Sequence, residues 1–222
     1  MTLTRDLIKN GGLRRMIAAG DQSVPPLTDD ELQASRDRTL ARRRAGAACW
    51  LFGYGSLIWN PTIQAAESRI GTARGWHRRF CLWTSLGRGS PERPGLMLGL
   101  ERGGSCRGVV FRIADDIVDA ELDLLWRREM VTGAYAPRWV SVATEAGPVD
   151  AIAFTINRDH PRYAGKLPDD QVAAAIAQAA GFLGPCAEYL DRTVAHLAEL
   201  GIADHRLTRL ANLVASKRTN GA

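Results

Sequence analysis

A long hydrophobic run is missing from the sequence. No stretch of about 18 consecutive apolar residues occurs in the 222-residue chain, so no segment is predicted to cross a membrane. The first twenty residues also contain no apolar stretch, which argues against a secretory signal, and Asp6 disfavours a mitochondrial transit peptide. We therefore expect a cytoplasmic chain, long enough to bury one sizeable core.

Closely spaced metal ligands and paired cysteines are missing as well. The cysteines are Cys49, Cys81, Cys106 and Cys186. None of them forms a CxxC pair, so we expect four reduced thiols rather than a disulfide framework or a zinc site. The four histidines are scattered and the HExxH pattern is absent, so we expect no metal.

Positive charge is in modest excess, with a formal net charge of +5. Its densest run is the triplet 42–44, three consecutive arginines. A stacking platform for nucleic acid would require aromatic residues between the basic ones, and none interleave here. We therefore interpret the triplet as a solvated face and expect no nucleic-acid partner.

The chain divides near residue 48. Residues 1–48 contain glycine and proline pairs and no strand pattern, and we interpret them as a partly helical N-terminal extension. Thr28 followed by Glu31 is a capping box, which predicts a helix running towards Arg44. We expect a globular domain over residues 49–218.

Within that domain, apolar runs and turn residues predict strands first and helices last. The expected strands are 49–52, 79–83, 96–100, 108–113, 138–143 and 149–157. The expected helices are 115–130, capped by Asp115, and then 169–180, 185–200 and 203–217. The glycine-rich turn at 102–105 predicts that 96–113 is a hairpin. This order indicates an α+β fold with a mixed or antiparallel sheet, not a doubly wound one.

Chemistry is most clearly indicated where the first strand ends. An apolar strand enters two glycines spaced by one residue, Gly53 and Gly55, and such a turn can present several backbone N–H groups to an anion. An ordinary strand-to-loop turn is the alternative interpretation. The segment matches neither the phosphate-binding GxxxxGK[ST] loop nor GxSxG, so Ser56 is a poor candidate nucleophile.

A second candidate is Glu129, at the expected end of an amphipathic helix and before a glycine turn. A glutamate beside Arg127 and Arg128 is commonly part of a surface ion pair, and that interpretation stays open from the residues alone. Because successive helical residues diverge on the surface, we predict that both arginines point away from Glu129.

Together these segments resemble the ChaC-type γ-glutamylcyclotransferases, which are specific for glutathione. The similar stretches are GYGSLIWNP at 53–61, PERPGLMLGLERGGSCRGVVFRI at 91–113, LWRREM at 125–130 and GPCAEYLDRTVAHLAELGI at 184–202. The resemblance covers about residues 49 to 215. Four stretches in the family's order, with the glutamate included, are a specific signal, whereas one short motif would be weak.

The resemblance implies an α+β fold around a partly closed β-barrel, with helices outside and a helical C-terminal part. It implies that the γ-glutamyl group is held by Gly53, Tyr54, Gly55, Ser56, Leu57 and Ile58. Glu129 would act first as general base and then as general acid. The expected reaction cyclises the γ-glutamyl end of glutathione to 5-oxoproline and releases Cys-Gly, without a metal or organic cofactor.

Three other functions stay open at this point. The chain could act on other γ-glutamyl amines or peptides, or it could bind γ-glutamyl compounds as a regulator without turnover. A nucleic-acid-associated role rests on charge alone. The sequence predicts neither the oligomeric state nor a role for residues 1–48.

Overall fold

The computed structural model describes residues 3–20 and 24–220 of the chain. The helices are α1 (Arg5–Lys9), α2 (Gly12–Ala19), α3 (Asp29–Leu40), α4 (Ser56–Trp59), α5 (Val118–Glu129), α6 (Asp169–Gln178), α7 (Cys186–Glu199) and α8 (His205–Asn220). The main strands are β1 (Cys49–Gly53), β2 (Glu67–Thr84), β3 (Gly95–Ile113), β4 (Tyr135–Thr144) and β5 (Gly147–Ile156). A two-stranded sheet joins β6 (Ala180–Gly181) to β7 (Gly184–Pro185).

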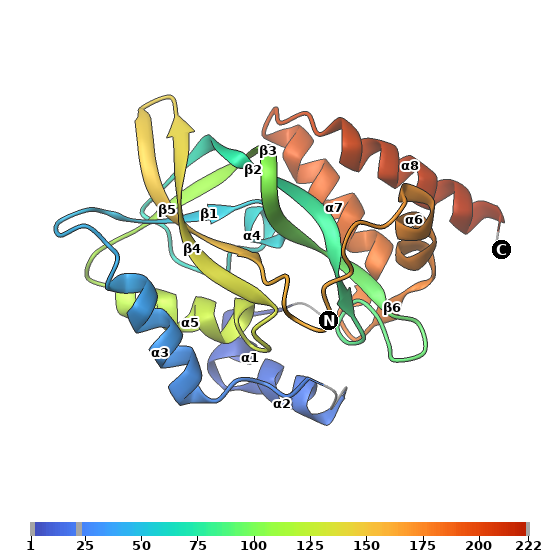
Figure 1. Cartoon of the computed structure of the whole chain (residues 1–222), viewed down its shortest axis with the longest axis horizontal. Helices are drawn as coiled ribbons and strands as arrows, with labels where there is room; N and C mark the ends of the chain where they lie inside the picture. The colour runs from blue at the N-terminus through green and yellow to red at the C-terminus, as the bar shows by residue number, and fades with distance from the viewer. Residues whose placement is uncertain (1–2, 21–23, 221–222) are drawn as a thin grey trace.

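The five main strands form a closed barrel in the order β1-β3-β2-β4-β5. Most neighbours are antiparallel, but β1 runs parallel to β5. Helices α6, α7 and α8 gather on one side of the barrel, and α3 and α5 cover another (Figure 1). The predicted α+β class, with a barrel, outer helices and a helical C-terminal part, is confirmed.

Strand β1 is apolar throughout because both of its faces are covered. Trp50 and Phe52 belong to the core that also contains residues of α6, α7 and α8, whereas Cys49 and Leu51 belong to the core beneath α5. Side chains alternate across a strand, so adjacent residues enter different cores. The strand therefore enters the following turn, at Tyr54, from a fixed direction.

The predicted hairpin within 96–113 is wrong. This stretch is part of one strand, β3, which pairs along β2 for most of its length. Gly103 and Gly104 have positive φ values of 106° and 70°, but they lie opposite Gly75, between the pairs Arg74–Ser105 and Trp76–Arg102. Two residues facing one make a β-bulge, which bends the strand around the barrel instead of reversing it.

Helix α5 is where the sequence predicts it, but its cap differs. The helix begins after Ile117 with no side-chain cap. Asp115 lies in the preceding turn, where its Oδ1 accepts a hydrogen bond from Arg43 Nη2 at 2.8 Å. The expected Asp115 cap is therefore wrong, because the carboxylate is taken by the chain that precedes β1.

The N-terminal segment packs on the barrel through α3. Its predicted capping box is present, with the Glu31 N–H donating to Thr28 Oγ1 at 3.2 Å and the Thr28 N–H donating to Glu31 Oε2 at 2.7 Å. The helix ends at Leu40, short of Arg44. Leu32 enters the core beneath α5, and Trp126 Nε1 donates to Ser35 Oγ at 3.1 Å.

All four cysteines are buried free thiols, as the sequence predicts. Burial raises the pKa of the Cys49 and Cys186 thiols to about 11 and that of Cys81 to about 12. It also raises the pKa of Cys106. Among the described residues, no helix combines the length and the apolar character needed to span a membrane.

Replacement of Leu32 tests whether residues 1–48 fold with the domain. Leu32→Ala should lower the free energy of unfolding by about 2–5 kcal/mol, since it opens a hole in the core shared with α5. Urea unfolding should still show one transition. Gln33→Ala, on the exposed face of the same helix, is the control and should change stability by less than about 0.5 kcal/mol. A separate early transition for α3 would contradict the expectation.

Candidate active site

The turn after β1 lies against the end of α5. A small cavity of about 20 Å³ brings four consecutive residues of the turn, 54–57, together with Glu129. Its remaining lining residues are Leu98, Tyr135, Phe154 and Tyr189. Two segments distant in the sequence therefore line one cavity.

A larger cavity of about 340 Å³ adjoins the small one. Both are lined by Ser56, Glu129, Tyr135 and Tyr189. The carboxylate of Glu129 therefore lies where the two cavities meet. This arrangement offers one compartment beside the backbone of 54–57 and a wider one beyond it.

Gly55 allows the turn to approach α7 closely. A Cβ built at this position would lie 3.0 Å from Tyr189 Oη and 3.5 Å from Leu98 Cδ1. A larger residue would push the turn away from the tyrosine. The second glycine of the motif is thus explained by space at the site.

Three tyrosines line the small cavity with Glu129, of which Tyr54 and Tyr189 are buried and Tyr135 is half-buried. Tyr54 Oη donates to the Phe154 carbonyl at 2.6 Å, and Tyr135 Oη donates to the Leu98 carbonyl at 2.8 Å. Burial raises the pKa of Tyr54, Tyr135 and Tyr189, and the nearby Glu129 raises each further. All three therefore stay neutral phenols at physiological pH.

Burial also raises the pKa of Glu129, whose side chain is only 13% exposed. Removing a carboxylate from water disfavours its charged form. Arg128 opposes the shift through its charge and a hydrogen bond, but the net direction is upward. A carboxyl with a raised pKa is suited to both accept and return a proton near neutral pH.

The prediction that both arginines point away from Glu129 is wrong for Arg128. Arg128 Nε lies 2.8 Å from Glu129 Oε1. Arg127 does turn away, towards Asp123 Oδ2 at 2.8 Å. The prediction used the directions of the Cβ atoms and neglected the length of arginine, which lets the guanidinium fold back beside the next side chain at the helix end.

Arg128 joins Glu129 to the turn after β1. Its side chain is only 4% exposed. Nη2 donates to Ser56 Oγ at 3.1 Å, and Nη1 donates to Thr62 Oγ1 at 2.8 Å and to the Asn60 carbonyl. The guanidinium therefore fixes the turn and the carboxylate relative to each other.

Comparisons with known proteins show the family to which the chain belongs. A family model described as ChaC-like protein matches residues 49–217. The chain is 40% identical to the glutathione-specific gamma-glutamylcyclotransferase of Escherichia coli strain K12, over 94% of this chain and 90% of that protein. The chain belongs to the ChaC-like family.

Other relatives support the family and the fold. The glutathione-specific gamma-glutamylcyclotransferase 1 of Homo sapiens is 35% identical over 77% of this ChaC-like chain and 80% of its own length. A crystal structure of a yeast gamma-glutamyl cyclotransferase specific to glutathione superposes with a TM-score of 0.73. At 22% identity it covers 78% of this chain and 98% of the yeast chain, and it shows the shared fold.

Sequence reasoning missed two residues of the ChaC-like site. Arg128 lies inside the LWRREM stretch, but the divergence of successive side chains on a helix predicted that it points away from Glu129. Tyr189 lies in the stretch 184–202, which the resemblance covers without assigning it a role. Its placement depends on the packing of α7 against α4 and β3, which spacing alone does not reveal.

Two of the expected binding residues lie outside both cavities. Gly53 ends β1 and is paired with Val109, and Ile58 packs between the two cores. Neither lines the small or the large cavity. Their contribution to binding stays a prediction, whereas Tyr54, Gly55, Ser56 and Leu57 line the small cavity directly.

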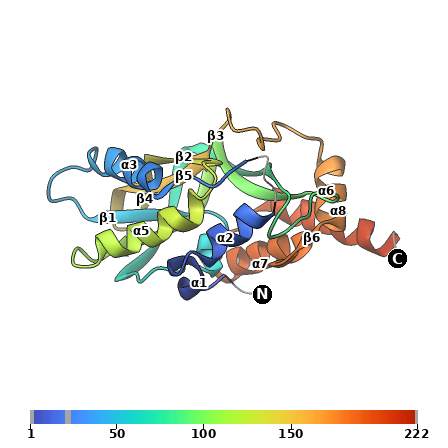
Figure 2. The ribbon, with the colours of Figure 1, turned by 90° about the horizontal axis from the view of Figure 1, so that it is seen from below.

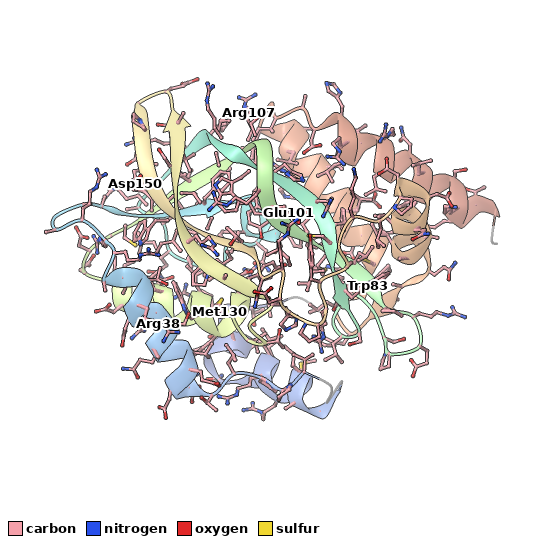
Figure 3. The ribbon with its side chains drawn as sticks, viewed as in Figure 1. Arg38, Trp83, Glu101, Arg107, Met130 and Asp150 are labelled. Carbon is pink, nitrogen blue, oxygen red and sulfur yellow. The ribbon has the colours of Figure 1, made fainter. Side chains whose placement is uncertain are left out.

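The arginine triplet 42–44 lines a third cavity, which also contains Trp50, Trp76 and Asp150. Figure 3 shows Asp150 far from Met130, the residue after Glu129. No aromatic residue interleaves with the triplet in the sequence, but the fold brings tryptophans of distant segments to the same cavity.

Trp50 and Trp76 offer no open stacking surface, and the third tryptophan of this cavity, Trp139, is half-buried. Trp50 and Trp76 are 6% and 8% exposed. Arg69 covers the Trp50 ring at 4.7 Å from its centroid, and Arg102 covers the Trp76 ring at 4.4 Å. Within residues 3–20 and 24–220, no cluster of three or more His, Cys, Asp or Glu could hold a metal ion.

The raised pKa of Glu129 predicts a pH-dependent stability effect. The folded chain holds this proton more tightly than the unfolded chain, so its stability falls as pH rises from the unfolded pKa through the folded pKa. Glutamine does not ionise, so Glu129→Gln removes this pH-dependent loss of stability. The free energy of unfolding of this variant relative to wild type should therefore increase as the pH rises above about 4, the pKa of an unperturbed glutamate.

Urea unfolding at several pH values measures the difference. Glu145→Gln, on the exposed β4–β5 turn, controls for the loss of one carboxylate. A difference between the Glu129→Gln and wild-type chains that stays flat or decreases with pH would contradict the expectation.

Proposed function

We infer that this chain is a glutathione-specific γ-glutamylcyclotransferase, which converts glutathione to 5-oxoproline and Cys-Gly. The observation that carries the inference is the buried Glu129 carboxylate beside the turn 54–57, joined to it by Arg128. The names of the relatives from Escherichia coli and Homo sapiens support glutathione as the substrate.

The proposed reaction is intramolecular. The α-amine of the γ-glutamyl group attacks its own γ-carbonyl, a C–N bond closes the five-membered lactam, and the bond to the cysteine nitrogen breaks. No enzyme nucleophile is needed, since both reacting groups belong to the substrate. The first task of the site is to hold the substrate in a folded conformer, which is a large orientation effect.

The second task is proton transfer by Glu129. The α-ammonium must lose a proton before attack, and the departing amine must gain one, so a single carboxylate can serve both steps. A free α-amine has a pKa of about 8 and an ordinary glutamate one of about 4.3, a mismatch of about 5 kcal/mol. Burial narrows this gap because it raises the pKa of Glu129.

The third task is to stabilise negative charge on the carbonyl oxygen. The N–H groups of Ser56 and Leu57 lie in the first turn of α4, where a helix provides no acceptor for them. We assign them as oxyanion donors, with the γ-glutamyl group held against residues 53–58. The neutral tyrosines 54, 135 and 189 would exclude water, which would otherwise compete by hydrolysis.

The proposal describes a cytoplasmic enzyme that needs no metal or organic cofactor. Reduced thiols are the rule in that compartment, and the four cysteines are free. Incubation of the purified chain with glutathione, without added metal, tests the reaction. Equal amounts of 5-oxoproline and Cys-Gly are expected, and absence of both would favour another γ-glutamyl substrate or a binding protein without turnover.

Glu129→Gln should lower turnover of glutathione at least about a hundredfold, since it removes the group that moves both protons. The replacement keeps the size of the side chain, so the folded state should persist by circular dichroism. Asp123→Asn, on the exposed side of the same helix, is the control and should retain activity. Substantial 5-oxoproline formation by the Glu129→Gln chain would remove Glu129 from the proposed role.

Arg128→Met should move the acid limb of the kcat/KM–pH profile to higher pH. Arg128 holds the pKa of Glu129 down, so its loss lets burial act unopposed, and the base loses its proton only at higher pH. The level of activity should also fall, since the turn loses its anchor. Arg127→Met is the matched control, because Arg127 is paired with Asp123, and its acid limb should stay in place.

A further inference from the structure

The larger cavity is not formed by the barrel domain alone. Leu3, Leu13 and Ile17 line it together with Ser56 and Glu129. These three residues precede residue 49, where the match to the family model begins. The N-terminal segment therefore supplies a wall of the candidate active site.

This wall is held in place by an ion pair between the half-exposed Arg5 and the buried Glu121. Arg5 Nη1 and Nη2 donate to Glu121 Oε2 and Oε1, each at 2.7 Å. The Glu121 side chain is 3% exposed, and its Oε2 also accepts the Gln64 N–H at 2.9 Å. A bidentate pair of this kind fixes orientation as well as distance, so α1 has a defined position on α5. Figure 2 shows α1 and α2 on the side of the molecule where α5 and α7 lie.

The same segment contacts Asn60 and Thr62, which Arg128 also contacts. Arg5 Nη1 donates to the Thr62 carbonyl at 2.6 Å, and Asn60 Nδ2 donates to the Leu3 carbonyl at 3.0 Å. Thr62 has a φ of 55°, a left-handed conformation that costs energy for a β-branched residue. Contacts from Arg5 on one side and Arg128 on the other stabilise this conformation.

The wall is apolar where it faces the cavity. Leu13 and Ile17 form a cluster with Ile8 and Leu124, and Leu86 and Phe182 pack against it. The polar lining of the cavity lies elsewhere and includes Arg88, Glu188 and Arg192. The cavity therefore has an apolar side on α2 and a charged side on α7 and the β2–β3 connection.

We propose that residues 3–17 determine which leaving groups the enzyme accepts, by packing Leu13 and Ile17 against the side chain of the residue that departs. The inference rests on the proposed function. With the γ-glutamyl group against 54–57 and the reacting carbonyl beside Glu129, the rest of the substrate extends into the larger cavity. A small, weakly polar side chain such as that of cysteine fits the apolar wall, and a carboxylate fits the charged side.

The test compares three substrates that differ only in the departing residue. They are glutathione, γ-glutamyl-glycyl-glycine, which lacks the side chain, and γ-glutamyl-phenylalanyl-glycine, which has a larger one. Leu13→Ala should lower kcat/KM for glutathione about tenfold, leave the glycyl substrate within about threefold, and raise the preference for the phenylalanyl substrate over glutathione at least about tenfold.

Ile8→Ala is the matched control. Ile8 is buried in the same apolar cluster but does not line the cavity, so Ile8→Ala destabilises the packing of α1 and α2 without changing a contact with the substrate. This variant should change kcat/KM for all three substrates by the same factor. If the Leu13→Ala chain does not fold, Ile17→Val, which removes one methyl group, should give a shift in the same direction of about threefold.

If Leu13→Ala or Ile17→Val changes kcat/KM by the same factor for all three substrates, the proposed role of the wall is overturned. Release of no 5-oxoproline by the wild-type chain from any of the three substrates is a different result. It would overturn the proposed function, and this inference with it.

Discussion

The guanidinium of Arg128 is the constraint on which the site depends. A buried cation is tolerated only if its N–H groups find acceptors, and here they are a carboxylate, two hydroxyls and a carbonyl. These acceptors come from Glu129, Ser56, Asn60 and Thr62. Satisfying one buried charge therefore sets the end of α5, the first turn of α4 and the chain after α4 in a single arrangement.

The same cation tunes the acid–base group. Burial raises the pKa of Glu129 and Arg128 lowers it, and the balance lies on the raised side. Burial alone would raise the pKa of Glu129 further, and the contact with Arg128 limits that rise. The opposition of the two effects suits a group that must work in both directions.

The secondary structure could be predicted from sequence wherever one local signal decided it. The capping box at Thr28 and the late helices α6, α7 and α8 were identified correctly, as was the apolar strand β1. The glycines at 103–104 led to the wrong prediction of a hairpin, because positive φ values occur in turns and in β-bulges alike. Only the partner strand, with Gly75 opposite them, distinguishes the two.

The site itself was only partly predictable. Glu129 and the turn 54–57 were found because they lie in recognisable motifs. The pairing of Arg128 depends on side-chain length and on acceptors more than sixty positions away. The position of Tyr189 depends on how α7 packs against the barrel. The wall formed by Leu13 and Ile17 depends on the ion pair between Arg5 and Glu121. Such contacts between distant segments leave no periodic trace in the sequence.

The buried cysteines have a consequence for an enzyme proposed to handle glutathione. Exchange between thiols and disulfides requires a thiolate that can reach the partner sulfur. Here burial holds the pKa of Cys49 and Cys186 at about 11 and that of Cys81 at about 12, and no cysteine lines the larger cavity. We therefore expect the four thiols to exchange poorly with glutathione or its disulfide, so that the redox state of the substrate has little effect on the chain that consumes it.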